Sequence, residues 1–257
     1  MRKRKVVGVI PARMEASRFP GKPLAMILGL PMIEHVRRRV CLSDVFDDIY
    51  VATCNKEIFD TVRKNGGKAL MTANTHQRCT DRVEEAVREI DADIVVIIQG
   101  DEPLLDPHIF HSLIEPMLRD NFLKCANLLS VINEKSDLAD TDIVKAVLDE
   151  QGFVMYYSRA PIPYLRADKS RPMYRQTGLS VFTKKFIQLF SNLAPTPLEK
   201  AESVDFLRIL EHGYEIKGVL YNNMTVGIDR QDDIQKVETI LKADPKQFGI
   251  YENILKI

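Results

Sequence analysis

Short apolar runs alternate with helical patterns over the first 130 residues of the chain. The apolar runs are rich in β-branched residues, which is typical of strands buried on both faces of a sheet. The strand candidates are 6–10, 49–53, 69–71 and 94–98, and the helix candidates are 33–41, 57–65 and 80–90. This alternation predicts an α/β fold with a mostly parallel central sheet and helices on both faces, in which ligands bind where the strands end.

The second half of the chain has a different pattern. Apolar runs at 144–148 and 154–158 flank the polar stretch 149–152, which predicts a β-hairpin. Helical patterns return at 184–192, 198–213 and 231–242, and 216–221 is a further strand candidate. No repeat or linker separates the two halves, so we expect a single domain over 1–257 with a hairpin-bearing elaboration in its second half.

Composition limits the kinds of partner. The 257 residues are 45% hydrophobic, and 36 basic side chains balance 36 acidic ones, so no long-range field attracts nucleic acid or an anionic membrane. No apolar stretch is long enough for a membrane span or a signal peptide. The four cysteines lack zinc spacing, and we expect free thiols. We therefore expect a cytoplasmic, soluble protein with a small-molecule partner, in which the basic run 37–39 lies on a solvated helix face.

A cationic loop follows the first strand. Arg13, Arg18 and Lys22 lie within ten residues of one another, and Ser17 and Gly21 allow close backbone approach. Such a loop can bind a polyphosphate through charge-assisted hydrogen bonds. It is not a Walker loop, because the required glycine and the Ser or Thr after Gly-Lys are missing. A solvated basic loop with prolines at its turns is the alternative.

Carboxylates follow two other candidate elements. Asp101 ends the buried run 94–98 in the sequence Gln-Gly-Asp-Glu-Pro, and Asp229 precedes the helical pattern 231–242. Mg²⁺ prefers one or two carboxylates together with phosphate oxygens, which Asp101 and a bound triphosphate could supply. Each carboxylate alone could instead cap the following helix.

Four motifs in order carry a family resemblance. They are the loop 11–23, the strand end 99–103, the segment 157–163 (Tyr-Ser-Arg-Ala-Pro-Ile-Pro) and Gly-Ile-Asp at 227–229. Together they resemble the 3-deoxy-manno-octulosonate cytidylyltransferases, or CMP-Kdo synthetases. The resemblance implies one cytidylyltransferase-like domain of the nucleotide-diphospho-sugar transferase type. It also implies a homodimer in nucleotide-sugar and lipopolysaccharide biosynthesis, which transfers CMP from CTP to Kdo or a related 2-keto sugar acid with Mg²⁺ as cofactor and releases pyrophosphate.

The resemblance also assigns residues to roles. Catalysis falls to Arg13, Lys22, Asp101 and Asp229, of which the two aspartates hold Mg²⁺. CTP contacts fall to Arg13, Ser17, Lys22, Thr72, His76, Gln77, Thr80, Arg82 and Gln99, with Arg18 as a further phosphate contact. Acceptor contacts fall to Arg159, Gln176, Glu199 and Glu202. Two of these have plainer alternatives, because His76 could be a local hydrogen-bonding residue and Arg159 could form a structural ion pair.

The chain also departs from the family pattern. Arg78 and Cys79 replace a Ser-Gly pair beside the nucleotide motif, while Gln176, Ser180 and Phe206 replace polar or aromatic residues on the acceptor side. Because sites that hydrogen-bond a hydroxyl are sensitive to such changes, we expect an altered acceptor pocket.

Two other functions fit the α/β pattern. One is a metal-dependent glycosyltransferase that uses a nucleotide-sugar, although such a donor has a diphosphate and does not need so cationic a loop. The other is a non-catalytic sensor that binds a nucleotide. The sequence does not fix whether one or two metal ions take part.

Overall fold

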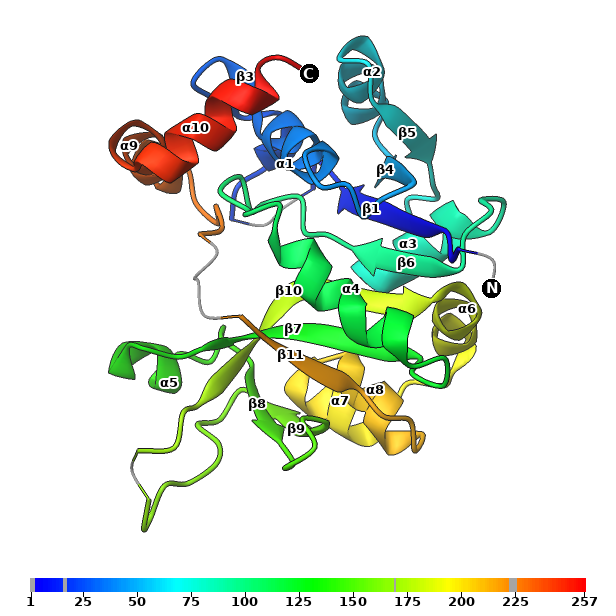
Figure 1. Ribbon diagram of the computed structural model, residues 1–257, viewed down its shortest axis with the longest axis vertical. Helices are drawn as coiled ribbons and strands as arrows, with labels where there is room; N and C mark the ends of the chain where they lie inside the picture. Colours follow the sequence, from blue (N-terminus) through cyan, green and yellow to red (C-terminus); the bar gives the residue numbers. More distant parts are fainter. Residues whose placement is uncertain (1–2, 16–17, 169, 222–225) are drawn as a thin grey trace. The chain divides into compact units, whose positions relative to one another are not determined.

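A computed structural model of the chain describes residues 3–15, 18–168, 170–221 and 226–257 (Figure 1). Its residues form two compact units, of which the first comprises Met1–Phe110 and Thr225–Ile257 and the second His111–Met224. Within the described residues no helix has the length and apolar character needed to cross a bilayer. The first unit is thus assembled from two separate stretches of the chain.

The first unit is built on four parallel strands in the order β6-β1-β4-β5. Its strands are β1 (Val6–Ala12), β2 (Met26–Ile27), β3 (Leu30–Pro31), β4 (Asp48–Thr53), β5 (Lys68–Met71) and β6 (Ile94–Ile97). Its helices are η1 (Lys22–Leu24), α1 (Met32–Cys41), α2 (Lys56–Lys64), α3 (Cys79–Val87), α9 (Asp233–Ala243) and α10 (Pro245–Ile254), and α4 (Ile109–Arg119) begins at its end. Strand, helix and parallel strand alternate as the sequence predicts, which confirms the α/β class.

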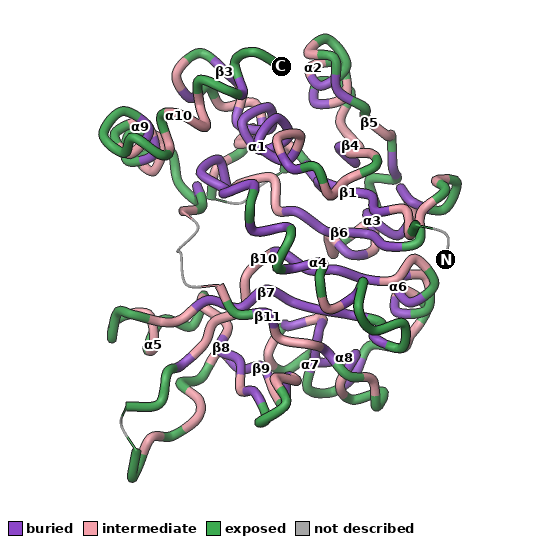
Figure 2. Tube along the Cα trace, in the orientation of Figure 1, coloured by how far each residue is buried: buried purple, intermediate pink, exposed green. Residues whose placement is uncertain are grey.

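Both faces of the central strands are covered. Every residue of β6 and every residue of β1 except the half-buried Pro11 is buried (Figure 2). Because side chains alternate between the faces of a sheet, a run without exposed positions requires cover on both sides. Helices α1 and α3 both pack against β1 and β4. The carboxyl ends of β1 and β6 therefore lie next to each other in a rigid frame.

The basic run of α1 is buried, which corrects the expectation of a solvated face. Arg37, Arg38 and Arg39 are 5%, 8% and 0% exposed. Arg37 and Arg38 share the carboxylate of Glu34, with Nη2–Oε2 and Nε–Oε2 distances of 2.6 and 3.0 Å. Arg39 donates to the side chain of Gln247 at 2.8 Å. The sequence pattern did not predict α10, and this C-terminal helix packs against α1.

The second unit has a mixed sheet. Strand β7 (Cys125–Val131) pairs in parallel with β11 (Lys217–Tyr221) and antiparallel with β10 (Tyr174–Thr183), while β8 (Lys145–Leu148) pairs antiparallel with β10 and with β9 (Val154–Ser158). The antiparallel β8–β9 pair confirms the predicted hairpin. The remaining elements are most of α4, α5 (Lys135–Ala139), α6 (Lys184–Asn192), α7 (Pro197–Glu202) and α8 (Phe206–Glu211).

The single helix expected at 198–213 was wrong, because two helices occupy this stretch. Helix α7 starts at a capping box formed by Thr196 and Glu199 and ends at Ser203, whose φ of 54° lies in the left-handed region. A left-handed residue ends the helical hydrogen-bond ladder and turns the chain. Helix α8 then places Phe206 in an aromatic cluster, with ring centroids 6.0 Å from Tyr157 and 5.8 Å from Phe182.

Candidate functional site

A pocket of about 360 Å³ opens at the carboxyl ends of the strands in the first unit. Of the described residues that line it, five are arginine or lysine and three are acidic, so an anionic ligand suits it. Nine predicted site residues line the pocket, namely Arg13, Arg18, Lys22, His76, Gln77, Arg82, Gln99, Asp101 and Asp229. Thr72 and Thr80 are buried beside these elements and are not lining residues, and Ser17 falls outside the described residues.

Lys22 joins the two carboxylates that are distant in the sequence. Its Nζ lies 2.8 Å from Oδ2 of Asp101 and 3.8 Å from Oδ1 of Asp229. It also donates to the backbone carbonyl of Ile228 at 2.8 Å. Two carboxylates and a carbonyl therefore surround one ammonium group, so the same oxygen atoms are within reach of a single cation. Within the described part of the chain, no group of three or more Asp, Glu, His and Cys side chains could hold a metal ion.

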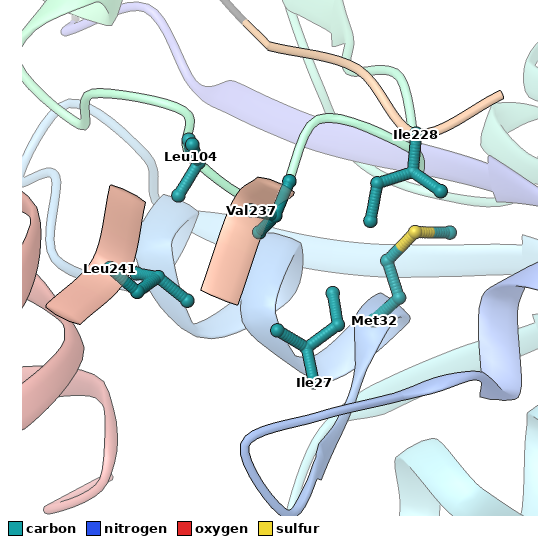
Figure 3. Close-up of a cluster of buried hydrophobic side chains, with 6 residues drawn as sticks. All are labelled: Ile27, Met32, Leu104, Ile228, Val237 and Leu241. Atoms are coloured by element: carbon teal, nitrogen blue, oxygen red, sulfur yellow. The ribbon is translucent and has the colours of Figure 1, made fainter. Parts of the chain in front are cut away.

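A hydrophobic cluster fixes the segment that carries Asp229. Ile228 is fully buried with Ile27, Met32 and Val237, and Figure 3 shows its side chain pointing toward that of Met32. The backbone N–H of Ile228 donates to the carbonyl of Asp101 at 2.9 Å. Burying an aliphatic side chain of this size contributes about 1.5–3 kcal/mol, enough to hold the segment in place. Core packing thus sets the distance between the two carboxylates.

Two glycines permit the close approach of the strand ends. A Cβ on Gly100 would lie 3.3 Å from the carbonyl oxygen of Pro11, a tight contact that would require the end of β1 to shift by a few tenths of an ångström. Gly21 has a φ of 76°, which L-residues rarely adopt, and its N–H donates to Met14 at 2.9 Å. This turn directs Lys22 toward Asp101.

The cationic side of the pocket is more open. Arg13 is exposed and lines the pocket. Arg18 Nη2 lies 3.3 Å from Oδ1 of Asp229, and both side chains are about half exposed. Water screens an ion pair of this kind, so it contributes little stability. The guanidinium groups at this rim can therefore turn toward a ligand at little cost.

Two side chains of helix α3 bind the segment 72–76, and between them they bond both the N–H and the carbonyl of Ala73. Arg82 Nη1 donates to Oγ1 of Thr72 at 2.6 Å and to the carbonyl of Ala73 at 3.2 Å. Glu85 accepts from the N–H of Ala73 at 3.0 Å and contacts Nε2 of His76. Burial tends to raise the pKa of Glu85, but the hydrogen bonds from His76 and Ala73 outweigh it and the pKa is lowered. The sequence did not single out Glu85, because nothing in its spacing marks it.

Two residues that depart from the family pattern beside the nucleotide motif also line the pocket. Arg78 and Cys79 line it at the start of α3. Gln99 Nε2 lies 3.8 Å from Sγ of Cys79, which is a weak contact. The amide of Gln99 therefore remains available to a ligand.

The predicted acceptor residues all lie in the second unit. Arg159 follows β9 and Gln176 lies in β10, where its backbone N–H donates to Val144 at 2.8 Å. Glu199 accepts from Nε of Arg208 at 2.7 Å in a buried ion pair. Glu202 is the last residue of α7 and faces the end of β9.

Arg159 does not form the structural ion pair that was the alternative for it. Its Nε donates to the carbonyl of Glu202 at 2.7 Å and its Nη1 to the carbonyl of Thr141 at 2.6 Å. Among the described residues, no carboxylate forms a salt bridge with this guanidinium. Its positive charge is oriented without being neutralised, as an anion-binding residue requires.

Comparison of the sequence with known proteins identifies the family of the chain. Residues 7–226 match the family described as cytidylyltransferase. The chain is 38% identical to the 3-deoxy-manno-octulosonate cytidylyltransferase of Geobacter metallireducens, with 91% of this chain and 96% of that protein covered. It is 41% identical to the protein of the same name from Syntrophobacter fumaroxidans, with 93% and 98% covered.

Solved structures agree. The structure of a CMP:2-keto-3-deoxy-manno-octonic acid synthetase in complex with CTP is similar at a TM-score of 0.89 and 34% identity, covering 93% of this chain and 98% of that one. A cytidylyltransferase from Leptospira borgpetersenii shares the fold at a TM-score of 0.62 and 18% identity, covering 99% of this chain and 94% of that one.

Proposed function

The chain belongs to the 3-deoxy-manno-octulosonate cytidylyltransferase family, and on that premise we propose that it transfers CMP from CTP to 3-deoxy-manno-octulosonate (Kdo) and releases pyrophosphate. The observation that carries the proposal is the convergence of Lys22, Asp101 and Asp229 in a cationic pocket at the strand ends. In the reaction, the anomeric hydroxyl oxygen of Kdo bonds to the α-phosphorus of CTP while the bond to the pyrophosphate oxygen breaks.

The donor atoms around Lys22 fit Mg²⁺. Asp101 and Asp229 would hold the ion, because carboxylate oxygens are the protein ligands that this hard cation prefers and phosphate oxygens and water complete its shell. When bound, Mg²⁺ would neutralise charge that builds up on the phosphates.

The triphosphate would bind along the cationic loop. Arg13 and Lys22 supply the charge, Ser17 is a further proposed contact, and Arg18 can leave Asp229 to join them. We propose that His76, Gln77, Arg82 and Gln99, which line the pocket, bind the base and ribose. Thr72 and Thr80 were expected as contacts, but both are buried and neither lines the pocket, and Thr72 accepts a hydrogen bond from Arg82, so supporting roles are favoured for them. Catalysis of phosphoryl-group transfer depends on in-line positioning and on charge stabilisation, so these residues need to form no covalent bond to the substrate.

The acceptor would be bound by the second unit. We assign the carboxylate of Kdo to Arg159, whose guanidinium is not neutralised by a carboxylate, and propose Gln176 as a polar contact. Glu199 and Glu202 were expected as substrate ligands, and their present partners, Arg208 and the end of β9, favour supporting roles instead.

The acceptor-side departures bear on substrate choice. Phe206 lies in the aromatic cluster with Tyr157 and Phe182 and is 5% exposed, so it offers no hydrogen bond to a sugar. Ser180 is likewise buried. We propose Kdo as the first acceptor to test and related 2-keto sugar acids as the next.

We further propose that residues 1–257 work as one catalytic domain, as a homodimer, in the cytoplasm, where nucleoside triphosphates are available. Sedimentation of the purified protein at several concentrations tests the subunit number.

Asp101→Asn tests the proposed reaction. With CTP, Mg²⁺ and Kdo, the wild type should release pyrophosphate and form a CMP conjugate that mass spectrometry identifies, and the variant should be about 10²–10³-fold slower because one metal ligand is lost. Asp60→Asn, on the exposed pair with Lys56 in α2, is the matched control and should leave the rate unchanged.

Other outcomes would replace the proposal. Turnover that is insensitive to Asp101→Asn would reject the metal assignment. Tight binding of UDP or CDP with indifference to CTP would indicate a glycosyltransferase that uses a nucleotide-sugar. CTP binding without turnover on any acceptor of the panel would indicate a nucleotide sensor.

A further inference from the structure

Glu202 directs its carboxylate to the end of β9. Its Oε1 accepts from the hydroxyl of Ser158 at 2.6 Å, and its Oε2 accepts from the backbone N–H of Arg159 at 2.9 Å. The hydroxyl oxygen of Ser158 in turn accepts from the N–H of Ala160 at 3.0 Å. The carboxylate therefore fixes three consecutive residues and does not contact the guanidinium of Arg159.

The same residue orients that guanidinium through its backbone. Nε of Arg159 donates to the carbonyl of Glu202, and Nη1 donates to the carbonyl of Thr141. A guanidinium has five N–H donors, and these bonds to described residues use two of them. Carbonyl oxygens orient the group but leave its positive charge in place, whereas a carboxylate in the same position would form a bidentate pair and neutralise it.

Lys145 connects the backbone of Arg159 to the segment 140–143. Its side chain is fully buried, and its Nζ donates to the carbonyls of Arg159, Asp140 and Ile143 at 3.0, 2.5 and 2.8 Å. The segment that includes Thr141 is thus tied to the backbone of Arg159. Arg159 is held at its N–H, at its carbonyl and at two side-chain nitrogens.

We propose that Glu202, supported by Lys145, is a positioning residue that presents Arg159 with its charge unneutralised to the carboxylate of the acceptor. This inference rests on the proposed function, in which Arg159 binds that carboxylate. Glu202 is then not a substrate ligand, which also agrees with its negative charge, because an acidic acceptor would be repelled by a carboxylate in direct contact.

Glu202→Ala should separate positioning from folding. We expect it to raise the KM for the acidic acceptor about tenfold, with kcat and the affinity for CTP changed less than about twofold, because misplacing one ligand-binding group weakens only that binding step. Glu202→Gln should restore the KM to within about threefold of the wild type, because an amide can accept from the N–H of Arg159 and donate to Ser158.

Glu211→Ala is the matched control. Glu211 also accepts from backbone N–H groups at the start of α7, those of Leu198 and Glu199 at 3.1 and 3.3 Å, but it does not contact Arg159. The Glu211→Ala substitution should lower the melting temperature without changing the KM for the acceptor. If Glu211→Ala and Glu202→Ala raise this KM equally, the role of Glu202 is structural and the inference is overturned.

Arg159→Ala completes the test. The KM should rise in this variant, and adding Glu202→Ala should then have little further effect, because residues that act through one another are not additive. A further tenfold rise in the double variant would mean that Glu202 touches the acceptor itself, against the inference. If Arg159→Ala raises the KM and Glu202→Ala does not, the inference fails while the proposed function stands. Absence of any CMP conjugate with the wild type would instead reject the proposed function.

Discussion

Charged side chains inside this protein have partners of two kinds, and the partner decides what the charge can do. In α1, Arg37 and Arg38 share the carboxylate of Glu34, so their charges are compensated and serve only the packing of the helix. Arg159 in the second unit has carbonyl partners and keeps a charge that a ligand can use. The acceptor therefore shows whether the charge of an arginine is compensated, and the carbonyl acceptors of Arg159 leave its charge uncompensated.

Glu34→Gln tests the arginines whose charge is compensated by a carboxylate. Glu34 is fully buried, and its removal would leave two buried guanidinium groups without a counter-charge, so we expect the free energy of unfolding to fall by about 3 kcal/mol. Urea denaturation at neutral pH measures this. Asp60→Asn breaks an exposed pair with Lys56 at the same i, i+4 spacing as Glu34–Arg38 and should cost less than about 0.5 kcal/mol. Equal losses in the two variants would contradict the argument.

The sequence predicts some site residues and misses others for a physical reason. Lys22 and Asp101 lie in the connections that follow predicted strands, and parallel strands bring such connections to one edge of a sheet. Glu85 and Lys145 act on backbone N–H or carbonyl groups of other segments. Every residue carries those backbone groups, so no pattern of side chains along the chain reveals these contacts before the fold is known.

At the scale of elements, strong periodicity was predictive and local irregularity was not. The short apolar runs became β1, β4, β5 and β6, and the helical pattern at 184–192 became α6. Strand β10 was missed because it contains the polar stretch 175–177 and a register shift between Gln176 and Ser180, which interrupts the alternation of apolar residues. The break between α7 and α8 depends on one left-handed serine, which a helical pattern does not mark.

Replacing a glycine by alanine should have opposite effects on stability at two positions. A Cβ on Gly67, in the turn from α2 to β5, would lie 2.7 Å from both Nε of Arg37 and Cγ1 of Val62, so Gly67→Ala should destabilise the protein by about 1–3 kcal/mol. Gly249 lies within α10 with no atom near the added carbon, and Gly249→Ala should stabilise by about 0.5–1 kcal/mol. Thermal unfolding of both variants checks the signs, and a destabilised Gly249→Ala would show that α10 does not pack as described.

At the scale of the whole molecule, the C-terminal stretch completes the first unit. Residues 226–257 supply Asp229 to the pocket and place Ile228 and Val237 in the core behind it (Figure 3). The same stretch covers α1, where Tyr251 stacks on His35 with ring centroids 5.6 Å apart. Folding of the unit and assembly of the nucleotide pocket therefore depend on the same contacts, and a buried group between these elements should report on the stability of the unit.

His35 is that group, and it makes stability depend on pH. Burial lowers its pKa to about 4 and outweighs the opposite effect of the hydrogen bond between Nε2 and the carbonyl of Ile27. Its Nδ1 is buried and has no hydrogen-bond partner among the described residues. Above pH 6.5 the imidazole is neutral in both the folded and the unfolded chain, and its contribution is complete. As pH falls from 6.5 toward 4, only the unfolded chain takes up the proton, so the free energy of unfolding decreases.

His35→Gln removes this proton linkage and keeps a donor for Ile27. Between pH 7 and pH 5 the wild type should lose about 2 kcal/mol more than the variant, since one pKa unit corresponds to about 1.4 kcal/mol. Comparing the two chains cancels the titration of the carboxylates, which both share. His108→Gln changes an exposed histidine and should follow the wild-type curve. If His35→Gln follows it as well, protons reach His35 in the folded protein as easily as in the unfolded one, and the C-terminal stretch does not seal α1 from water.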